Sequence, residues 1–311
     1  MSDFFTASVL VATVASGVRL STPYLLAALG ETFAQRSGVL NLGVDGVMLL
    51  GAFFGYWTVF THDNLVAGLL VGAAVGAVMG LVYAIVTLLF HAEQGISGIG
   101  IYLFGLGFSE LMYRQQVGTP LPIRGLGEVE IPLLADIPYI GEMLFRHSGI
   151  VYLAIVLVPL MAWVINRTQF GLNVRSVGET PDAADSLGVS VRRTRAVTIV
   201  VANALAGLGG AALALELGTF QQNLTNGLGF IAIALVYFGA WRPTGVLVGS
   251  LLFGLVTAVV NQWKTLGILS GSTASLATMA PALLTVLALA VIARRNSAQP
   301  AALTLPFQRG R

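Results

Sequence analysis

The chain has 311 residues, of which 56% are hydrophobic and 10% are charged, and its formal net charge is +2. Soluble domains carry about 25% charged residues, so this composition excludes a protein that faces water on all sides. The absence of cysteine excludes a disulfide framework, a thiolate metal site and a lipidated cysteine.

Apolar segments recur along the chain, and each is long enough to cross a hydrocarbon core of roughly 30 Å. We expect membrane-spanning helices in residues 4–29, 40–60, 65–90, 96–112, 150–165, 197–217, 228–241, 246–260 and 274–293. Because Arg19 and Pro23 lie within the first segment, it forms either one tilted helix or two short ones. We interpret it as a retained helix rather than a signal peptide, since no basic region precedes it. The pattern predicts an all-α polytopic membrane protein with roughly 8–10 transmembrane helices in a single domain, 1–311.

The basic residues predict how the chain is oriented. One side collects Arg36, Arg167, Arg175, Arg192, Arg193, Arg195, Arg242, Arg294, Arg295, Arg309 and Arg311, and the other collects Arg19, Arg114, Arg124, Arg146 and Lys264. Because cytoplasmic loops are richer in Lys and Arg, the first side is expected in the cytoplasm, with the C-terminus and the connection 166–195. The connection 113–149 then lies outside, where we expect it to pack as a small cap. The expected location is the bacterial cytoplasmic (inner) membrane.

Small residues recur at four-residue spacing in two of the predicted helices. The first ladder is Gly68, Gly72, Gly76 and Gly80, and the second is Ala202, Ala206, Gly210, Ala214 and Gly218. This spacing keeps small residues near one helix face and lets two backbones approach closely, which favours helix association in lipid. We therefore interpret both ladders as helix-packing surfaces.

Groups that would power transport or catalyse a reaction are missing from the sequence. Lys264 is the only lysine, and no P-loop is present, so the chain does not bind ATP in that way. His62, His91 and His147 lie far apart in the sequence, which argues against a metal site and against a Ser/His/Asp arrangement. The sequence predicts a protein that is not an enzyme and has no cofactor of its own.

Several charged residues lie in or beside predicted spans: Arg19, Glu31, Asp45, Glu110 and Glu216. An Asp at a helix centre costs about 2.5–3.5 kcal/mol on insertion scales, so such residues need an explanation. Glu31 and Asp45 bracket Arg36, which is compatible with a local ion-pair network, with a polar lining or gate, and with a proton-coupling carboxylate.

The segment NLGVDG, residues 41–46, forms a poor helix because each Gly costs roughly 0.8–1 kcal/mol relative to Ala. Irregular backbone at membrane depth persists only where protein or a water-filled cavity covers it. We therefore expect a broken or re-entrant helix start here, with Asn41 and Asp45 facing a polar cavity. The segment 226–245 shows a similar pattern, with glycines before a short apolar run.

The segment GETPDAADSLGV, residues 178–189, predicts a short helix with well-defined ends. Thr180 suits the N-cap, Pro181 the first helical position and Asp182 the first turn. Gly188 is placed to end the helix in a left-handed turn, and a small apolar face is expected from Ala183, Ala184 and Leu187. Such a helix is either a docking element for a cytoplasmic partner or an interfacial connector.

Three stretches, taken in chain order, resemble the permease subunits of bacterial ABC importers for branched-chain amino acids, simple sugars and nucleosides. They are GETFAQRSGVLNLGVDGVMLLGAF, GLNVRSVGETPDAADSLGVSVRRTR and GLGFIAIALVYFGAWRPTGVLVGSLLFG. The resemblance covers residues 22–291. Residues 30–31, 41–43 and 241–243 are most similar to the sugar and nucleoside branch, and the length resembles the shorter of two sister nucleoside permeases.

The resemblance implies a type II ABC-importer fold and a set of partners within the lipid bilayer and on both sides of it. A cytoplasmic ABC ATPase would supply ATP and Mg²⁺ chemistry, a sister permease would complete a heterodimer, and an extracytoplasmic solute-binding protein would dock near the external cap. No nucleic-acid partner is expected. The resemblance also implies that the short helix is the coupling helix, docking the ATPase through Glu179, Thr180, Pro181, Asp182, Ala183, Ala184, Leu187 and Gly188.

Polar residues in or at the ends of spans are our candidates for the translocation pathway: Asn41, Asp45, Asn203, Glu216 and Asn261. The aromatic residues Trp57, Phe230 and Trp241 either stack on a substrate ring or belong to the interfacial belt. The resemblance favours nucleosides as the substrate, ahead of ribose-like sugars. The buried charges are also compatible with an ion-coupled secondary transporter, in which Asp45, Glu31 or Glu216 titrates, and the apolar composition with a channel or membrane scaffold.

Overall fold

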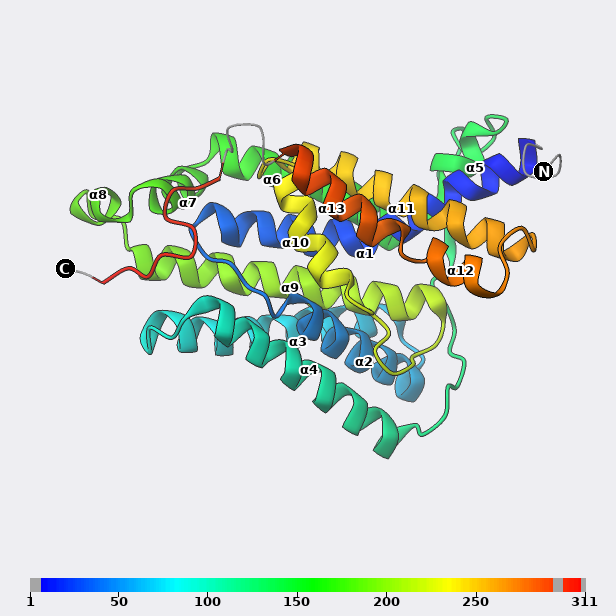
Figure 1. The fold of residues 1–311 in the computed structure, drawn as a ribbon, viewed down its shortest axis with the longest axis horizontal. Helices are drawn as coiled ribbons and strands as arrows, with labels where there is room; N and C mark the ends of the chain where they lie inside the picture. Colours follow the sequence, from blue (N-terminus) through cyan, green and yellow to red (C-terminus); the bar gives the residue numbers. More distant parts are fainter. Residues whose placement is uncertain (1–6, 293–298, 309–311) are drawn as a thin grey trace.

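The computed structural model describes residues 7–292 and 299–308, and it is almost entirely helical (Figure 1). Within these residues, seven helices are long and apolar enough to cross a membrane. They are α1 (Ala7–Arg36), α2 (Val44–His62), α3 (Leu65–Ala84, continued by the π-helical turn η2, Ile85–Leu89), α4 (Gln94–Gln116), α6 (Gly149–Arg167), α9 (Val191–Leu217) and α11 (Pro243–Thr265). The predicted polytopic, helical class is confirmed.

Two further apolar helices are shorter: α10 (Leu228–Phe238) and α13 (Ala280–Ile292). The predicted count of 8–10 spans is reached only when these two are added to the seven. At 11 residues, α10 extends about 16 Å, roughly half of a hydrocarbon core. The irregular connection 218–227 precedes it, so α10 is the short half of a broken membrane segment.

The two ends of the helix bundle carry different small elements (Figure 1). At one end lie α7 (Gln169–Glu179), α8 (Pro181–Ser186) and the C-terminal segment 299–308, and we name this the α8 end. At the other, the α5 end, lie α5 (Ile140–Leu144), α12 (Gly271–Ala277) and the strands β1 (Glu128–Glu130) and β2 (Arg146–Ser148), which pair antiparallel. This strand pair, within the predicted cap 113–149, is an exception to the all-α prediction.

The described basic residues divide between the two ends as their sequence positions predicted. Arg36, Arg167, Arg175, Arg192, Arg193, Arg195 and Arg242 lie on the helix termini and connections of the α8 end. Arg19, Arg114, Arg124, Arg146 and Lys264 lie toward the α5 end. Residues 1–6, the arginines at 294, 295, 309 and 311, and the last residue of the predicted span 274–293 lie outside the described residues.

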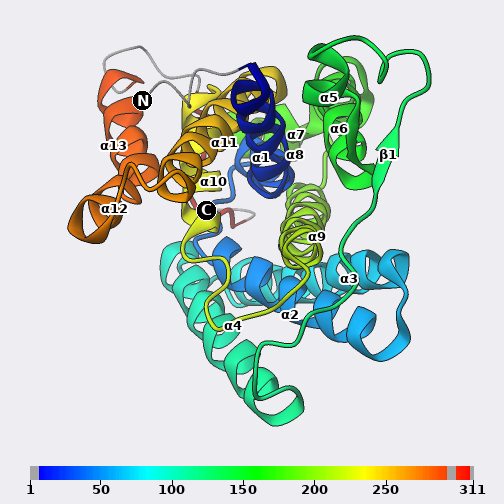
Figure 2. The ribbon, with the colours of Figure 1, turned by 90° about the vertical axis from the view of Figure 1, so that its right-hand side faces the viewer.

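Helix α9 lies between two groups of helices, α2–α3–α4 on one side and α1 with α10, α11 and α13 on the other (Figure 2). Its neighbours approach closely because glycines face each other. A Cβ added at Gly72 would lie 2.5 Å from the Cβ of Ala211, and one at Gly76 would overlap the carbonyl oxygen of Asn203. Likewise, a Cβ at Gly210 would overlap the carbonyl oxygen of Met48. The glycine ladder of α3 therefore sets the distance between α3 and α9.

Helix α1 is continuous from Ala7 to Arg36, so of the two alternatives for this segment the single helix is formed and the two short helices are not. Pro23 removes one backbone donor within it. The hydroxyl groups of Ser21 and Thr22 donate to the carbonyl oxygen of Val18, at 2.7 and 3.3 Å, in the turn before the proline. Packing of α1 on both α9 and α11 then holds the helix together across the proline.

Candidate functional site

The short helix α8 begins and ends where its sequence predicted, although its cap differs in detail. Pro181 occupies the first helical position, and Thr180 precedes it without a side-chain capping hydrogen bond. Gly188 has φ +86°, and the N–H of Val189 donates to the carbonyl oxygen of Ala184 at 3.0 Å. The helix is therefore closed at its C-terminus by a left-handed glycine turn, a conformation that costs a residue with a Cβ more.

The two faces of α8 have different surroundings. Ala184 is buried against Val177 and Val191, with Phe307 of the C-terminal segment packed beside them. Leu187, in contrast, is 85% exposed at the outer tip of the α8 end. The predicted apolar face is thus divided. Ala184 packs against the rest of the chain, whereas the side chain of Leu187 contacts little of it and faces outward.

The C-terminal segment fastens the region behind α8, a role that the sequence did not indicate. The N–H of Ala302 donates to the carbonyl oxygen of Gly178 at 2.8 Å, and the N–H of Ala301 to Oε2 of Glu179 at 3.3 Å. Farther along, the N–H of Thr304 donates to the carbonyl oxygen of Gly38 at 3.1 Å. The segment thereby connects α7 with the α1–α2 connection.

Two hollows flank this assembly at the α8 end. One, of about 670 Å³, is lined by Glu179, Thr180, Pro181, Asp182 and Ala183 together with residues of the C-terminal segment. The other, of about 470 Å³, extends from His91, Glu93 and Gln94 to Asp185, Arg192 and Arg195. Both lie beside α8, so a partner that covers this end of the molecule would meet polar and apolar surfaces together.

Asn41 is buried, and it ties the α1–α2 connection to the middle of α9. Its Nδ2 donates to Oδ1 of Asn203 at 2.9 Å, and its own Oδ1 accepts from the N–H of Gly43 at 2.8 Å. Nδ2 of Asn203 in turn donates to the carbonyl oxygen of Ile199 at 2.8 Å. These bonds pair both buried amides with groups of the described chain, so their burial needs no aqueous cavity.

Asp45 performs a similar role between two helix starts. Its carboxylate is fully buried and accepts from the N–H of Gly229 at 2.8 Å and from Oγ1 of Thr225 at 3.1 Å. Asp45 lies in the first turn of α2, and Gly229 lies in the first turn of α10. The carboxylate therefore holds the break before α10 against α2, with its negative charge at two helix N-termini.

The predicted ion-pair network of Glu31, Arg36 and Asp45 is not formed in the described chain, and that interpretation is corrected. Glu31 accepts from Nε2 of Gln35 at 3.2 Å, and Nε of Arg36 donates to the carbonyl oxygen of Trp241 at 3.1 Å. Asp45 bonds to α10 and its preceding turn instead, because the α1–α2 connection carries it away from the end of α1.

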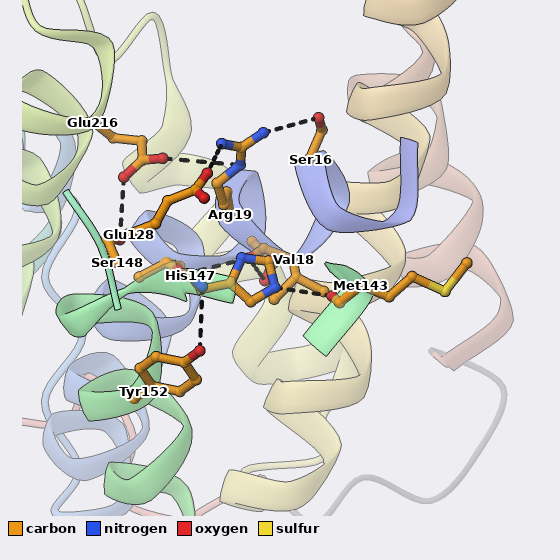
Figure 3. Close-up of polar contacts among 11 residues, drawn as sticks. Ser16, Val18, Arg19, Glu128, Met143, His147, Ser148, Tyr152 and Glu216 are labelled. Atoms are coloured by element: carbon orange, nitrogen blue, oxygen red, sulfur yellow. Dashed lines mark hydrogen bonds and ion pairs between the residues drawn. The ribbon is translucent and has the colours of Figure 1, made fainter. Parts of the chain in front are cut away.

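Glu216 and Asn261 lie apart from the Asn41–Asp45 region. Glu216, near the end of α9, accepts from Oγ of Ser148 at 3.2 Å and lies 4.0 Å from Nε of Arg19 (Figure 3). Nη1 of Arg19 also lies 3.7 Å from Oε1 of Glu128 in β1. Asn261 is exposed on α11. The structure thus brings together Asn41 with Asn203, but not the five candidates as one cluster.

The three candidate aromatic residues differ in availability. Nε1 of Trp241 donates to Oε1 of Gln35 at 2.9 Å, and this indole is 1% exposed, so it has no face free for a ligand. Trp57 stacks between Phe53 and Phe60. Phe230 alone among the three is more than one-third exposed, and its ring contacts Tyr102 of α4 edge to face, with centroids 5.2 Å apart.

Over residues 13–293 the chain matches the family described as branched-chain amino acid transport system / permease component. The chain belongs to this permease family. Its multi-pass fold and its non-catalytic character follow from that membership. As the permease component of an ABC transporter, it works with a separate ATPase and with a binding protein.

Similar proteins come from both archaea and bacteria. The chain is 35% identical over 278 residues to the putative glucose ABC transporter permease protein TsgC13 of Haloferax volcanii, covering 88% of this chain and 83% of the relative. It is 33% identical over 288 residues to the nucleoside ABC transporter permease protein NupC of Lactococcus lactis, covering 89% and 91%. The guanosine ABC transporter permease protein NupQ of Bacillus subtilis is 33% identical over 305 residues, covering 94% of each chain.

A second guanosine ABC transporter permease protein of Bacillus subtilis, NupP, is 27% identical over 255 residues, covering 78% of this chain and 71% of that relative. No solved structure matches the chain. The similarity therefore extends over most of the chain. The similar permeases are named for different substrates: glucose, nucleosides and guanosine.

Proposed function

We propose that this permease forms one half of the translocation pathway of an ATP-driven importer for nucleosides, with α8 as the helix that docks the ATPase. The observation that carries the proposal is the arrangement of α8: its inner side is anchored by Ala184, while Leu187 is 85% exposed at the tip. With Ala184 fixed against the protein, Leu187 is the large apolar side chain of this segment that remains available to a partner. Residues 179–188 are then the docking surface.

The position of α8 suggests how ATPase closure reaches the membrane helices. α8 joins α7 to α9, and α9 packs against α1, α2 and α3. A movement of α8 would therefore be passed directly to the central helix of the bundle. In this arrangement the α8 end is cytoplasmic, the C-terminus lies on that side, and the cap 113–149 faces the binding protein.

The proposal of a sister permease is supported by the pairs of relatives. In Bacillus subtilis, two guanosine permeases match this chain with different coverage, and the chain spans 94% of NupQ but 71% of NupP. A chain that matches one member of such a pair over nearly its whole length fits a heterodimer of a shorter and a longer permease.

Nucleosides are the substrate we propose, and glucose-like sugars are the second candidate because TsgC13 is named as a putative glucose permease. Two of the three relatives at 33–35% identity are named for nucleosides or guanosine. An ion-coupled transporter receives no support from Asp45, whose oxygens are occupied by Thr225 and Gly229.

The test is purification of the tagged chain from its native membrane in mild detergent, followed by mass spectrometry and transport assays of the reconstituted complex. We expect recovery of a P-loop ATPase and a second permease, and ATP-dependent uptake of radiolabelled guanosine. Uptake of glucose in preference to guanosine would reject the nucleoside assignment. Recovery of the chain alone, with solute uptake that needs no ATP, would reject the importer assignment.

A further inference from the structure

The connection 218–227 between α9 and α10 runs inside the membrane-spanning part of the protein. Its inner end is fixed by Asp45, through Thr225 and the N–H of Gly229. Nearby, Asn41 bonds to Asn203, which lies twelve residues into the 27-residue helix α9, about 18 Å along a helix of about 40 Å. The connection therefore descends from the α5 end of α9 to about the middle of the bundle.

The connection has two distinct sides. Phe220, Leu224 and Thr225 are buried, and Phe220 packs among Phe53, Tyr56 and Tyr113. Thr219 is half-buried, and the exposed side chains are all amides: Gln221, Gln222, Asn223 and Asn226. The buried side anchors the segment, and the amide side faces away from the protein.

Lipid is an unsuitable environment for this amide side. In the part of the chain that the structure describes, the N–H groups of residues 220–225 donate no hydrogen bond to another backbone group. An unsatisfied peptide or amide group in hydrocarbon costs several kcal/mol, so irregular backbone is found at this depth only beside water or protein. Viewed from the α5 end, the connection passes over α2 and α4 on its way to α10 (Figure 2).

A hollow of about 440 Å³ opens at the outer part of the connection, lined by Gln221 and Gln222 with Tyr113, Gly118 and Pro120. Nε2 of Gln222 donates to Oε1 of Glu110 in α4 at 3.0 Å, and Glu110 is also paired with Arg114. At the inner end, the exposed amide of Asn226 lies four residues before Phe230, whose ring contacts Tyr102. Exposed amides, then the exposed ring of Phe230 against the half-buried Tyr102, thus follow one another from the hollow to mid-membrane.

We propose that the connection 218–227, with Phe230 and Tyr102, is the wall of the translocation pathway, and that Asn226 and Phe230 contact a neutral ring-bearing solute midway. This inference rests on the proposed importer function. Amide groups hydrogen-bond to sugar hydroxyls and to base edges, and an aromatic ring stacks on a planar base. The exposed residues of this wall carry no charge beyond the Glu110–Arg114 pair at the mouth. The wall therefore suits an uncharged solute such as a nucleoside better than a zwitterionic amino acid.

Cysteine accessibility tests the wall directly, because the natural chain contains no cysteine and needs no background removal. We would make Gln222→Cys, Tyr102→Cys and Phe230→Cys in the full complex, in native membranes, and treat them with a membrane-impermeant cationic methanethiosulfonate. The matched control is Leu103→Cys, the neighbour of Tyr102 on α4, which is 58% exposed on an apolar face. Thiols in lipid stay protonated and unreactive toward such a reagent.

We expect Gln222→Cys and at least one of Tyr102→Cys and Phe230→Cys to be labelled at least tenfold faster than Leu103→Cys. Guanosine at saturating concentration, with the binding protein and ATP present, should slow labelling at position 102 or 230 several-fold. Labelling of both mid-membrane cysteines at the rate of Leu103→Cys would overturn the inference. Labelling of the wall without protection by guanosine or glucose would overturn the solute-contact part.

The same samples separate this inference from the proposed function. If the natural chain in matched membranes imports guanosine with ATP while the mid-membrane cysteines remain unreactive, the importer function stands and the wall assignment fails. If labelling is slowed by glucose but not by guanosine, the wall assignment stands and the nucleoside assignment fails.

Discussion

Nη1 of Arg195 donates to the carbonyl oxygen of Leu305 at 3.0 Å, although 110 residues separate them. Nε of the same guanidinium donates to the carbonyl oxygen of Ser37 at 3.0 Å, and Arg195 is 1% exposed. One side chain on the second turn of α9 therefore fastens both the C-terminal segment and the α1–α2 connection, directly behind α8. The region behind α8, the proposed docking helix, is tied to α9 through this point.

Replacing Arg195 by Ala should therefore weaken both the fold and the coupling. The buried carbonyl group of Ser37 left unpaired costs about 1–3 kcal/mol, and the partly buried carbonyl group of Leu305 also loses its donor. We expect a lower unfolding temperature in detergent, and loss of most ATP-dependent uptake. Arg193→Ala is the control, because Arg193 is exposed two residues earlier on α9. Equal unfolding temperatures for the two variants would contradict the role of Arg195.

Replacing Leu187 by Asp should separate docking from folding. Leu187 is 85% exposed, so its substitution removes almost no contact within this chain, and the unfolding temperature should change little. A charge at an apolar docking point should reduce recovery of the ATPase in pull-down at least tenfold. Leu133→Asp is the matched control, because Leu133 is also 85% exposed but lies in the predicted cap. ATPase recovery unchanged by Leu187→Asp would reject the docking role of the tip.

The parts of the site that sequence analysis predicted are those with local causes. The limits of α8 follow from Pro181 and Gly188, whose conformational preferences act within one turn. The charge of Asp45 inside an apolar segment indicated a special role, but its partners lie 180 and 184 residues away, and only the fold brings them together. The C-terminal fastening was not predictable, since it joins backbone groups such as those of Ala302 and Gly178.

Replacing Gly76 by Ala should separate α3 from α9. A Cβ at Gly76 would overlap the carbonyl oxygen of Asn203 and lie 3.0 Å from the Cα of Gly207, so both backbones would have to move. Overpacking of this kind costs about 1–3 kcal/mol, which exceeds the gain of about 1 kcal/mol from the higher helix propensity of Ala. We expect a lower unfolding temperature, whereas Gly100→Ala, with open space at its Cβ, should be neutral or stabilising. A neutral Gly76→Ala would show that this contact does not set the helix distance.

Stability should decrease in acid because of His147, which lies in β2 outside the membrane-spanning helices. The side chain is fully buried, its Nε2 donates to the carbonyl oxygen of Met143 at 2.9 Å, and its buried Nδ1 has no partner among the described residues (Figure 3). Burial, with a smaller contribution from Arg19, lowers the pKa of His147, so the unfolded chain binds the proton more readily than the folded one. The contribution of neutral His147 to the free energy of unfolding is therefore fully present above the ordinary His pKa of about 6.5, and it is lost as the pH falls below that value.

Thermal unfolding in detergent between about pH 7.5 and about pH 5 measures this loss. We expect it in the natural chain and in the control His62→Gln, whose side chain is exposed, and we expect a smaller loss in His147→Gln. An unchanged acid response in His147→Gln would contradict this role of His147.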